Sequence, residues 1–211
     1  MSVLCIVDLG HGNLRSVYKA FERVAKDSSV KVIMTSDYKE VSKADKIVLP
    51  GVGAFRTCRS DLDKIPGMQE ALTEAVIQKK RLFLGICIGM QFLADTGEED
   101  GETSGLRWIS GRVARLNQES LIVPHMGWNT LNDVAENKAL FRGVQEGDHV
   151  YFAHSYHFKP RDMKDVLAFT DYGGAVVAAI GRENIYGIQF HPEKSQGCGM
   201  KVLRNFLEMV E

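Results

Sequence analysis

The sequence predicts an α/β fold, with a mostly parallel central sheet, helices on both faces and some antiparallel strands in the C-terminal half. In the first half, short apolar runs that end near Gly or Pro alternate with segments of helical periodicity, which is typical of parallel strands joined by helices. In the second half, strand-like segments follow one another across short turns, which favours antiparallel pairing. We expect residues 1–211 to form a single domain, since this length is ordinary for one hydrophobic core.

The first half contains the predicted parallel strands and the helices between them. The strands are short apolar runs at residues 3–9, 30–34, 46–49 and 82–86. A helix begins at Asn13, whose side chain can cap it, and runs to about Ala25. One face of this helix is apolar and carries Leu14, Val17, Tyr18 and Phe21. Further helices are expected at residues 68–78 and 88–93.

The second half is predicted to be rich in strands and to close with a helix. We expect strands at residues 111–116, 121–123, 128–131, 150–153, 166–172, 176–180 and 185–189. The closing helix covers residues 199–210, where apolar side chains recur at helical spacing. Between the two halves, the acidic stretch DTGEEDGETSG at residues 95–105 is expected to be a solvated surface loop without a function.

Composition and charge exclude several classes of protein. The chain is 45% hydrophobic and 25% charged, so it can bury a core without disulfides or a structural metal. Its net charge of −1 gives no overall attraction to nucleic acid or to a membrane surface. Its four cysteines form no C-x-x-C pair, which argues against a zinc knuckle or a disulfide framework. The opening MSVLCIVDLG is typical of a first strand and not of a signal peptide, so we expect a cytoplasmic protein.

Cys87 lies in the apolar run LFLGICIGMQFL, where a predicted strand gives way to a predicted helix. Gly85 and Gly89 flank it, two residues away on either side. Such a turn can hold a cysteine in a strained backbone conformation and present its sulfur to a ligand, as in a nucleophile elbow. A buried structural cysteine is the alternative, and this stretch alone supports the two about equally. The other cysteines lack this setting, and we expect them to be structural: Cys5, Cys58 and Cys198.

A base for such a nucleophile is available in the late segment QFHPEKS. His191 ends a predicted strand, and Glu193 follows two residues later, so in extended backbone the two side chains point the same way. Pro192 between them disfavours a helix at His191. Taken alone, His191 is better explained as an ordinary histidine in a turn, and Glu193 as a carboxylate exposed to solvent. Together with the turn at Cys87, they indicate a base and the carboxylate that orients it.

Acyl transfer also needs donors for the developing oxyanion. The amide of Ile88, at the start of the predicted helix, is one candidate. The segment PGVGAF is the other, because Gly51 and Gly53 allow a backbone N–H to turn towards a ligand. A plain turn is the alternative there. Both segments follow neighbouring parallel strands at their carboxyl ends, where open α/β sheets bind ligands.

The segments PGVGAF, GICIGMQFL and QFHPEKS, in this order, resemble the class I (triad) glutamine amidotransferases, and the match spans nearly the whole chain. Three further segments resemble the glutaminase subunits of imidazole glycerol phosphate synthase: DLGHGNLRSV, PHMGWN and YFAHSYHF. The resemblance implies the three-layer fold of class I glutamine amidotransferases. It implies hydrolysis of glutamine to glutamate without a cofactor or metal. It also implies that the ammonia passes to a partner (β/α)8-barrel cyclase subunit in a heterodimer, which converts PRFAR to imidazole glycerol phosphate and AICAR.

The resemblance also implies roles for individual residues. Cys87 would be the nucleophile, His191 the general base and acid, and Glu193 the orienting carboxylate. The backbone amides of Gly53 and Ile88 would form the oxyanion hole; family members often have leucine in place of Ile88, which leaves that amide unchanged. The residues expected to contact the substrate are Gln91, His154, Ser155 and Tyr156. Those expected to face the cyclase are Asn13, Trp128 and Asn129.

Three alternatives stay open at this point. The chain could supply ammonia to another acceptor, as a purine, guanylate or anthranilate glutaminase does, although PHMGWN argues against this. It could be a stand-alone cysteine hydrolase of related topology, which would work without a partner. It could be a non-catalytic scaffold, against which the intact Cys87, His191 and Glu193 speak.

Overall fold

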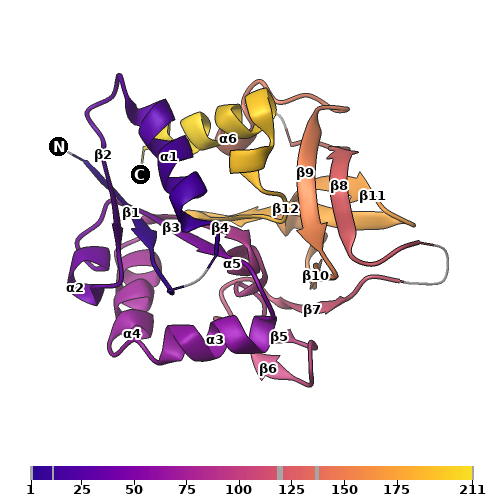
Figure 1. Cartoon of the computed structure of the whole chain (residues 1–211), viewed down its shortest axis with the longest axis horizontal. Helices are drawn as coiled ribbons and strands as arrows, with labels where there is room; N and C mark the ends of the chain where they lie inside the picture. The colour runs from indigo at the N-terminus through magenta and orange to yellow at the C-terminus, as the bar shows by residue number, and fades with distance from the viewer. Residues whose placement is uncertain (1, 11, 118–120, 136–137, 211) are drawn as a thin grey trace.

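A seven-stranded sheet forms the centre of the computed structural model, which describes residues 2–10, 12–117, 121–135 and 138–210 (Figure 1). The strand order is β11-β12-β13-β4-β3-β1-β2. Five of these strands run parallel: β1 (Val3–Val7), β2 (Lys31–Thr35), β3 (Lys46–Gly51), β4 (Leu82–Cys87) and β13 (Ile185–Ile188). The antiparallel strands at one edge are β12 (Ala175–Arg182) and β11 (Val166–Asp171). The predicted mostly parallel sheet with antiparallel additions is confirmed.

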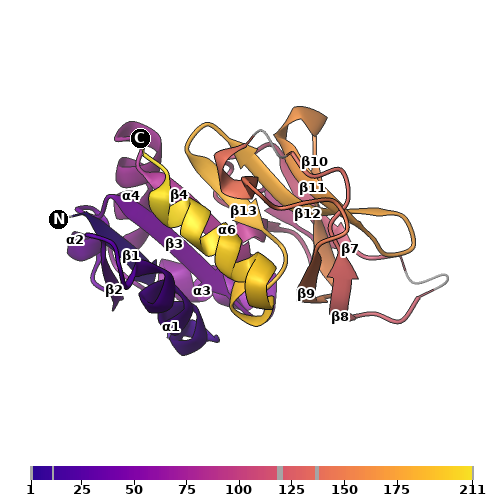
Figure 2. The same ribbon diagram turned by 90° about the horizontal axis from the view of Figure 1, so that it is seen from above.

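Helices cover both faces of this sheet. Figure 1 shows α1 (Leu14–Ala25) and α6 (Gln196–Glu208) on one side, and α3 (Phe55–Asp63) and α4 (Met68–Thr73) on the other. The view from above shows α6 lying along the sheet beside α1 (Figure 2). The two helices meet where the rings of Phe21 and Phe206 pack edge to face, with centroids 6.4 Å apart. The short helix α2 (Tyr38–Val41) follows β2. The three-layer arrangement that the sequence predicts is therefore present.

The remaining strands form two small sheets beside the edge of the central sheet that β11 and β12 form (Figure 1). One has the order β10-β7-β5-β6, from β10 (Tyr156–Pro160), β7 (Gly111–Arg115), β5 (Thr96–Gly97) and β6 (Thr103–Ser104). The other pairs β8 (His125–Thr130) with β9 (His149–His154), antiparallel. Three 3₁₀ turns are also present: η2 (Ala139–Phe141), η3 (Met163–Asp165) and η4 (Pro192–Lys194). No helix within the described ranges is both long and apolar enough to cross a membrane.

Some predicted elements differ from those observed. The strand predicted at residues 121–123 is wrong, because pairing begins only at His125, after Pro124, which has no N–H to donate to a ladder. The helix predicted at residues 68–78 is α4 followed by a π-helical turn, η1 (Glu74–Gln78). Helix α3 was not predicted.

The helix after Cys87 is also shorter than predicted. It is the single turn α5 (Ile88–Gln91), where the sequence favours a helix to residue 93. The carbonyl groups of the residues just after this turn accept hydrogen bonds from the backbone of residues 106–109 instead of from a further helical turn. Tertiary pairing therefore ends the helix early.

Candidate active site

Cys87 ends β4 in a strained backbone conformation. Its φ is 55° and its ψ is −108°, a combination that a side chain with a Cβ rarely adopts. The turn leaves no space for side chains at its flanks. A Cβ added to Gly85 would lie 2.3 Å from the carbonyl oxygen of Gly89, and one added to Gly89 would lie 1.7 Å from that of Leu49. The turn thus has the geometry of a nucleophile elbow.

His191, Glu193 and Asn13 form a hydrogen-bonded chain behind the sulfur. The Nδ1 atom of His191 lies 2.9 Å from Oε1 of Glu193, and the Asn13 side-chain amide donates to the same oxygen at 3.1 Å. His191 also forms a side-chain hydrogen bond with Cys87, for which its Nε2 atom remains. Both the imidazole and the Glu193 carboxylate are almost fully buried, with 4% and 1% of their side chains exposed. The structure therefore brings Cys87, His191 and Glu193 together, as the sequence predicts.

The electrostatics of this chain favour a charged pair. Burial lowers the pKa of His191, but its hydrogen bonds to Cys87 and Glu193 outweigh burial, so the pKa is raised above its usual value. Burial raises the pKa of Glu193, but the hydrogen bond and charge of His191, together with the Asn13 amide, hold it below its usual value. Glu193 is therefore a carboxylate, which fixes a proton on Nδ1 of His191.

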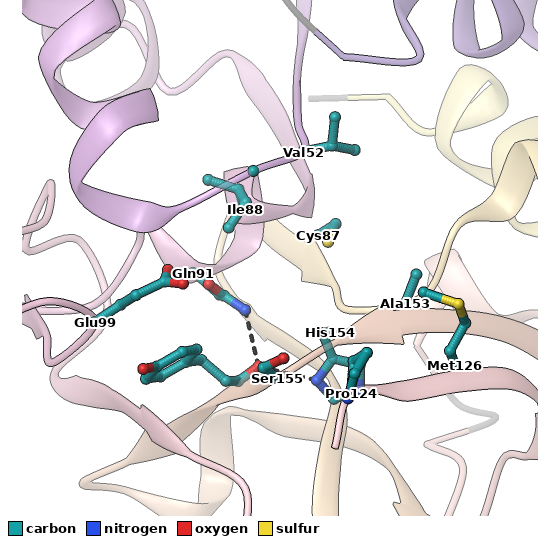
Figure 3. Close-up of a pocket in the computed structure, with 12 residues that line it drawn as sticks. Val52, Cys87, Ile88, Gln91, Glu99, Pro124, Met126, Ala153, His154 and Ser155 are labelled. Atoms are coloured by element: carbon teal, nitrogen blue, oxygen red, sulfur yellow. Dashed lines mark hydrogen bonds between the residues drawn. The ribbon is translucent and has the colours of Figure 1, made fainter. Parts of the chain in front are cut away.

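A cavity of about 210 Å³ opens in front of the sulfur (Figure 3). It has room for a ligand of amino-acid size. Its walls include the residues predicted to form the oxyanion hole and to contact substrate: Gly53, Ile88, Gln91, His154, Ser155 and Tyr156. The register of β3 and β4 explains the placement of the glycine segment, because Gly51 pairs with Cys87 across the two parallel strands. No group of three or more His, Cys, Asp and Glu side chains in the described part of the chain is placed to hold a metal ion.

Glu99 is a cavity residue that the sequence does not reveal. It belongs to the acidic stretch expected to be a solvated loop without a function, and for this residue that expectation is wrong. Its side chain lines the cavity (Figure 3). Its Oε2 accepts a hydrogen bond of 2.7 Å from the backbone N–H of Phe55 at the start of α3. The charged loop has no periodicity that would reveal this, and the Phe55 N–H that Glu99 accepts from belongs to α3, a helix that the sequence analysis did not predict.

The residues predicted to face a partner differ in their surroundings. Trp128 is exposed on β8, at 47%, close in sequence to the exposed side chains of Ile122 and Met126, at 83% and 64%. Asn129 directs its amide inward, where Nδ2 donates to the Asp171 carbonyl at 2.8 Å and lies 3.2 Å from Nε2 of His125. Asn13 precedes α1 as predicted, but its side chain makes no cap hydrogen bond. Its amide is used on Glu193 instead.

Comparison with known proteins identifies the family. The family model described as "Glutamine amidotransferase class-I" matches residues 5–210. The chain therefore belongs to the class-I glutamine amidotransferases.

Several relatives that match nearly the whole chain are named as one particular protein, imidazole glycerol phosphate synthase subunit HisH. The protein of that name from Rhodospirillum rubrum is 51% identical over 208 residues, which cover 97% of each chain. That from Rhodopseudomonas palustris is 49% identical over 214 residues, which cover 99% of each chain.

Solved structures show the same fold. One described as a glutamine amidotransferase superposes with a TM-score of 0.74 at 19% identity, and covers 98% of each chain. The glutaminase domain of CTPS from Trypanosoma brucei, with bound acivicin, superposes with a TM-score of 0.67 at 16% identity, and covers 100% of this chain and 96% of that one.

Proposed function

We propose that this chain is the glutaminase subunit of imidazole glycerol phosphate synthase. It hydrolyses glutamine to glutamate and passes the ammonia to a cyclase subunit, which uses it to convert PRFAR to imidazole glycerol phosphate and AICAR. The observation that carries this proposal is the identity of about half of all residues to HisH proteins over nearly the whole of both chains. The buried hydrogen bond between His191 and Glu193, with Cys87 beside it, supports the hydrolytic half of the reaction.

In the first step, the Cys87 sulfur attacks the side-chain amide carbon of glutamine. The carbon–oxygen double bond opens, and the negative charge on the oxygen is stabilised by the backbone N–H groups of Gly53 and Ile88. Because the raised pKa keeps His191 charged at neutral pH, the proton of the thiol already resides on Nε2 of His191 when the sulfur attacks, while Glu193 holds the imidazolium through Nδ1. When the tetrahedral intermediate collapses, His191 gives this proton to the leaving nitrogen, which departs as ammonia.

In the second step, a water molecule attacks the glutamyl thioester. His191 accepts a proton from this water, and collapse of the second intermediate breaks the carbon–sulfur bond. Glutamate leaves, and the proton stays on Nε2 of His191 beside the released sulfur. Throughout the cycle Glu193 stays ionised and only orients the base, which agrees with its lowered pKa.

The cavity walls suit the polar ends of glutamine. The Glu99 carboxylate lines the cavity and complements the α-ammonium group of the substrate. Gln91, His154, Ser155 and Tyr156 line the same space and would bind the rest of the molecule. A cytoplasmic glutamine pool would supply this site, and a single domain of 211 residues would contain it.

The cyclase would dock at the mouth of this cavity. Met126 lines the cavity and is also exposed, as is Trp128 two residues later on β8. These side chains form an apolar surface that a partner can bury. We propose a (β/α)8-barrel subunit in a heterodimer, with Trp128, Asn129 and Asn13 at or near the contact, so that ammonia is released towards the partner and not into solvent.

The test is a glutaminase assay combined with binding to candidate partners. The chain is mixed with a (β/α)8-barrel cyclase, or with a purine synthetase as a control, and glutamate formation and complex formation are measured. We expect binding to the cyclase alone, with imidazole glycerol phosphate formed from glutamine and PRFAR. Binding to the purine synthetase instead would contradict the assignment of the acceptor. Efficient turnover without any partner would favour a stand-alone hydrolase.

A further inference from the structure

Gln189 is a fully buried polar residue that the catalytic scheme above does not use. It follows β13 and has 0% of its surface exposed. Its backbone is fixed by the hydrogen bond from its N–H to the Ala178 carbonyl, at 2.8 Å. Its side-chain amide contacts two groups of the active site at once. Oε1 accepts from Nε2 of Gln91 at 3.1 Å, and Nε2 donates to the Cys87 sulfur at 3.6 Å.

The direction of this amide follows from its neighbours. The Gln91 side-chain nitrogen also donates to the backbone carbonyl of Tyr156, at 3.0 Å. A backbone carbonyl can only accept, so the Gln91 nitrogen must face Tyr156. The same nitrogen faces Gln189, which must therefore present its oxygen there. Its own nitrogen is then left to donate to Cys87, in addition to the hydrogen bond between Cys87 and His191.

The orientation has a consequence for Gln91. Both contacts use its nitrogen, so its oxygen Oε1 is buried without a hydrogen-bond partner. Gln91 lines the cavity, and in Figure 3 its oxygen lies on the side of Glu99, away from the bonded nitrogen. A buried acceptor without a donor costs stability, which a ligand bearing N–H groups can restore. The acceptors of Gln91 and Glu99 together suit a cationic ammonium group.

We propose that Gln189 is a positioning residue with two tasks. Its oxygen fixes Gln91 so that the Gln91 oxygen faces the cavity as an acceptor for the α-ammonium group of the substrate. Its nitrogen holds the Cys87 sulfur in place for attack. This inference rests on the proposed glutaminase function and adds to it the residue that links recognition of the ammonium group to the position of the nucleophile.

Two substitutions separate the tasks. Gln189→Glu keeps an oxygen acceptor for Gln91 but replaces the donor to the sulfur by an acceptor. Gln189→Met has a similar length and removes both contacts. Gln145→Met, at an exposed glutamine outside the cavity lining, is the matched control. Each variant is assayed in complex with the cyclase, against glutamine and against glutaramic acid, which is glutamine without the α-ammonium group.

For Gln189→Glu we expect kcat to fall by about tenfold or more, the effect of losing one hydrogen bond to a charged group, with KM for glutamine within about threefold of the parent. For Gln189→Met we expect kcat to fall similarly and KM to rise by about tenfold. The preference of Gln189→Met for glutamine over glutaramic acid should shrink by about the same factor, because Gln91 can then rotate. Alkylation of the sulfur by chloroacetamide, with Cys87→Ala as the background, should slow in both variants and stay unchanged in Gln145→Met.

Parent-like kcat, KM and alkylation rates in both variants would overturn the proposal, as would a loss of thermal stability without a change in these rates. If Gln189→Met does not fold, the split between kcat and KM in Gln189→Glu decides the question. The proposed function is tested separately by the parent complex. If the parent does not hydrolyse glutamine, that function fails, whereas an active parent with active variants refutes only the role of Gln189.

Discussion

The side-chain amide of Asn13 donates to the Glu193 carboxylate at 3.1 Å, across 180 residues of sequence. Glu193 Oε1 therefore receives hydrogen bonds from both Asn13 and His191. These bonds restrict rotation of the carboxylate, which in turn aligns the imidazole with Cys87. A residue next to the start of α1 thus supports the geometry of a site built on β4 and β13.

Asn13→Ala should lower kcat for glutamine by a factor of roughly 3 to 10 in the complex, the effect of losing one hydrogen bond. Asn13→Asp should lower it further, because a second carboxylate would repel Glu193. Complex formation is measured in parallel, since Asn13 is also expected near the partner. A loss of activity that disappears at saturating cyclase would show that Asn13 acts only through docking.

Cys87→Ala should abolish imidazole glycerol phosphate formation from glutamine, because no nucleophile remains. Ammonia supplied in the buffer should still support the reaction, since the cyclase carries out its own chemistry. Cys87→Ser can retain a trace of activity, because a hydroxyl is a much weaker nucleophile at neutral pH. Substantial glutamine-driven turnover by Cys87→Ala would refute its assignment as the nucleophile.

His191→Ala should lower glutaminase turnover more than Glu193→Ala does, because the imidazole moves the proton and the carboxylate orients it. The double variant should lose far less than the product of the two single losses, since the residues act as one unit. The four proteins are compared by kcat under identical conditions. Losses that multiply would assign Glu193 to a separate role.

The isolated chain should be a poor glutaminase that the cyclase activates. Gly53 has a φ of +122°, and Val52 lies between two glycines, so a peptide in this segment can rotate at low steric cost. One orientation presents an N–H to the oxyanion and the other a carbonyl, and the loss of one such donor lowers the rate by roughly a hundredfold or more. A partner that binds the active orientation better would shift this equilibrium.

Glutamine hydrolysis is therefore measured for the chain alone, with cyclase, and with cyclase plus a substrate analogue. Equal rates in all three conditions would argue against activation by the partner. Gly53→Val should reduce the activation but leave complex formation intact, because a β-branched residue strongly disfavours this φ. Gly127→Ala, also at a glycine of positive φ but with open space around it, is a control for backbone strain on β8.

Acid should destabilise the fold before the carboxylates titrate. Burial lowers the pKa of His125 to about 4 and that of His154 to about 3, and the two rings contact each other with nitrogens 3.0 Å apart. Burial also lowers the pKa of His157 to about 4. Unfolded histidines bind protons near pH 6.5, so the stability that these neutral side chains provide is complete above that value and is lost progressively as the pH falls from about 6.5 to about 4. The pKa of His191 is shifted in the opposite direction. Its contribution to the stability of the fold is therefore lost only in alkali, as the pH rises through its raised pKa.

The measurement is the melting temperature of the chain between pH 7.5 and pH 4.5. A loss of about 2 kcal/mol would lower it by roughly 4–8 °C for a chain of this size. His125→Phe should flatten this dependence, since the ring stacks between Phe152 and Tyr172, with centroids 4.6 and 3.9 Å away. A pH profile identical in parent and variant would show that His125 does not titrate with unfolding.

The sequence predicts the parts of the site that depend on local pattern. The glycines two residues on either side of Cys87 permit a tight turn, so the strained elbow can be inferred without a structure. The extended backbone predicted from His191 to Glu193 is wrong beyond His191, because residues 192–194 form the 3₁₀ turn η4, which still brings the carboxylate to Nδ1 of His191. Contacts between distant side chains cannot be inferred in this way. The inward direction of Glu99, the use of Asn13 on Glu193 and the two contacts of Gln189 all depend on which strands become neighbours. The wrong strand at residues 121–123 shows the same limit, since its apolar residues match the pattern but pair with no described strand.

The crowding around Gly85 and Gly89 affects how one decides from sequence whether a member of this family is an active enzyme. Every amino acid other than glycine carries a Cβ, and at either position that atom would overlap a backbone group of the turn. Any replacement must therefore shift the backbone around the turn that holds the nucleophile, even if the cysteine, histidine and glutamate remain. An intact triad is consequently not enough to classify a homologue as an active enzyme. A homologue with the triad but without one of these glycines is a candidate pseudoenzyme, retained for binding its partner and not for hydrolysis.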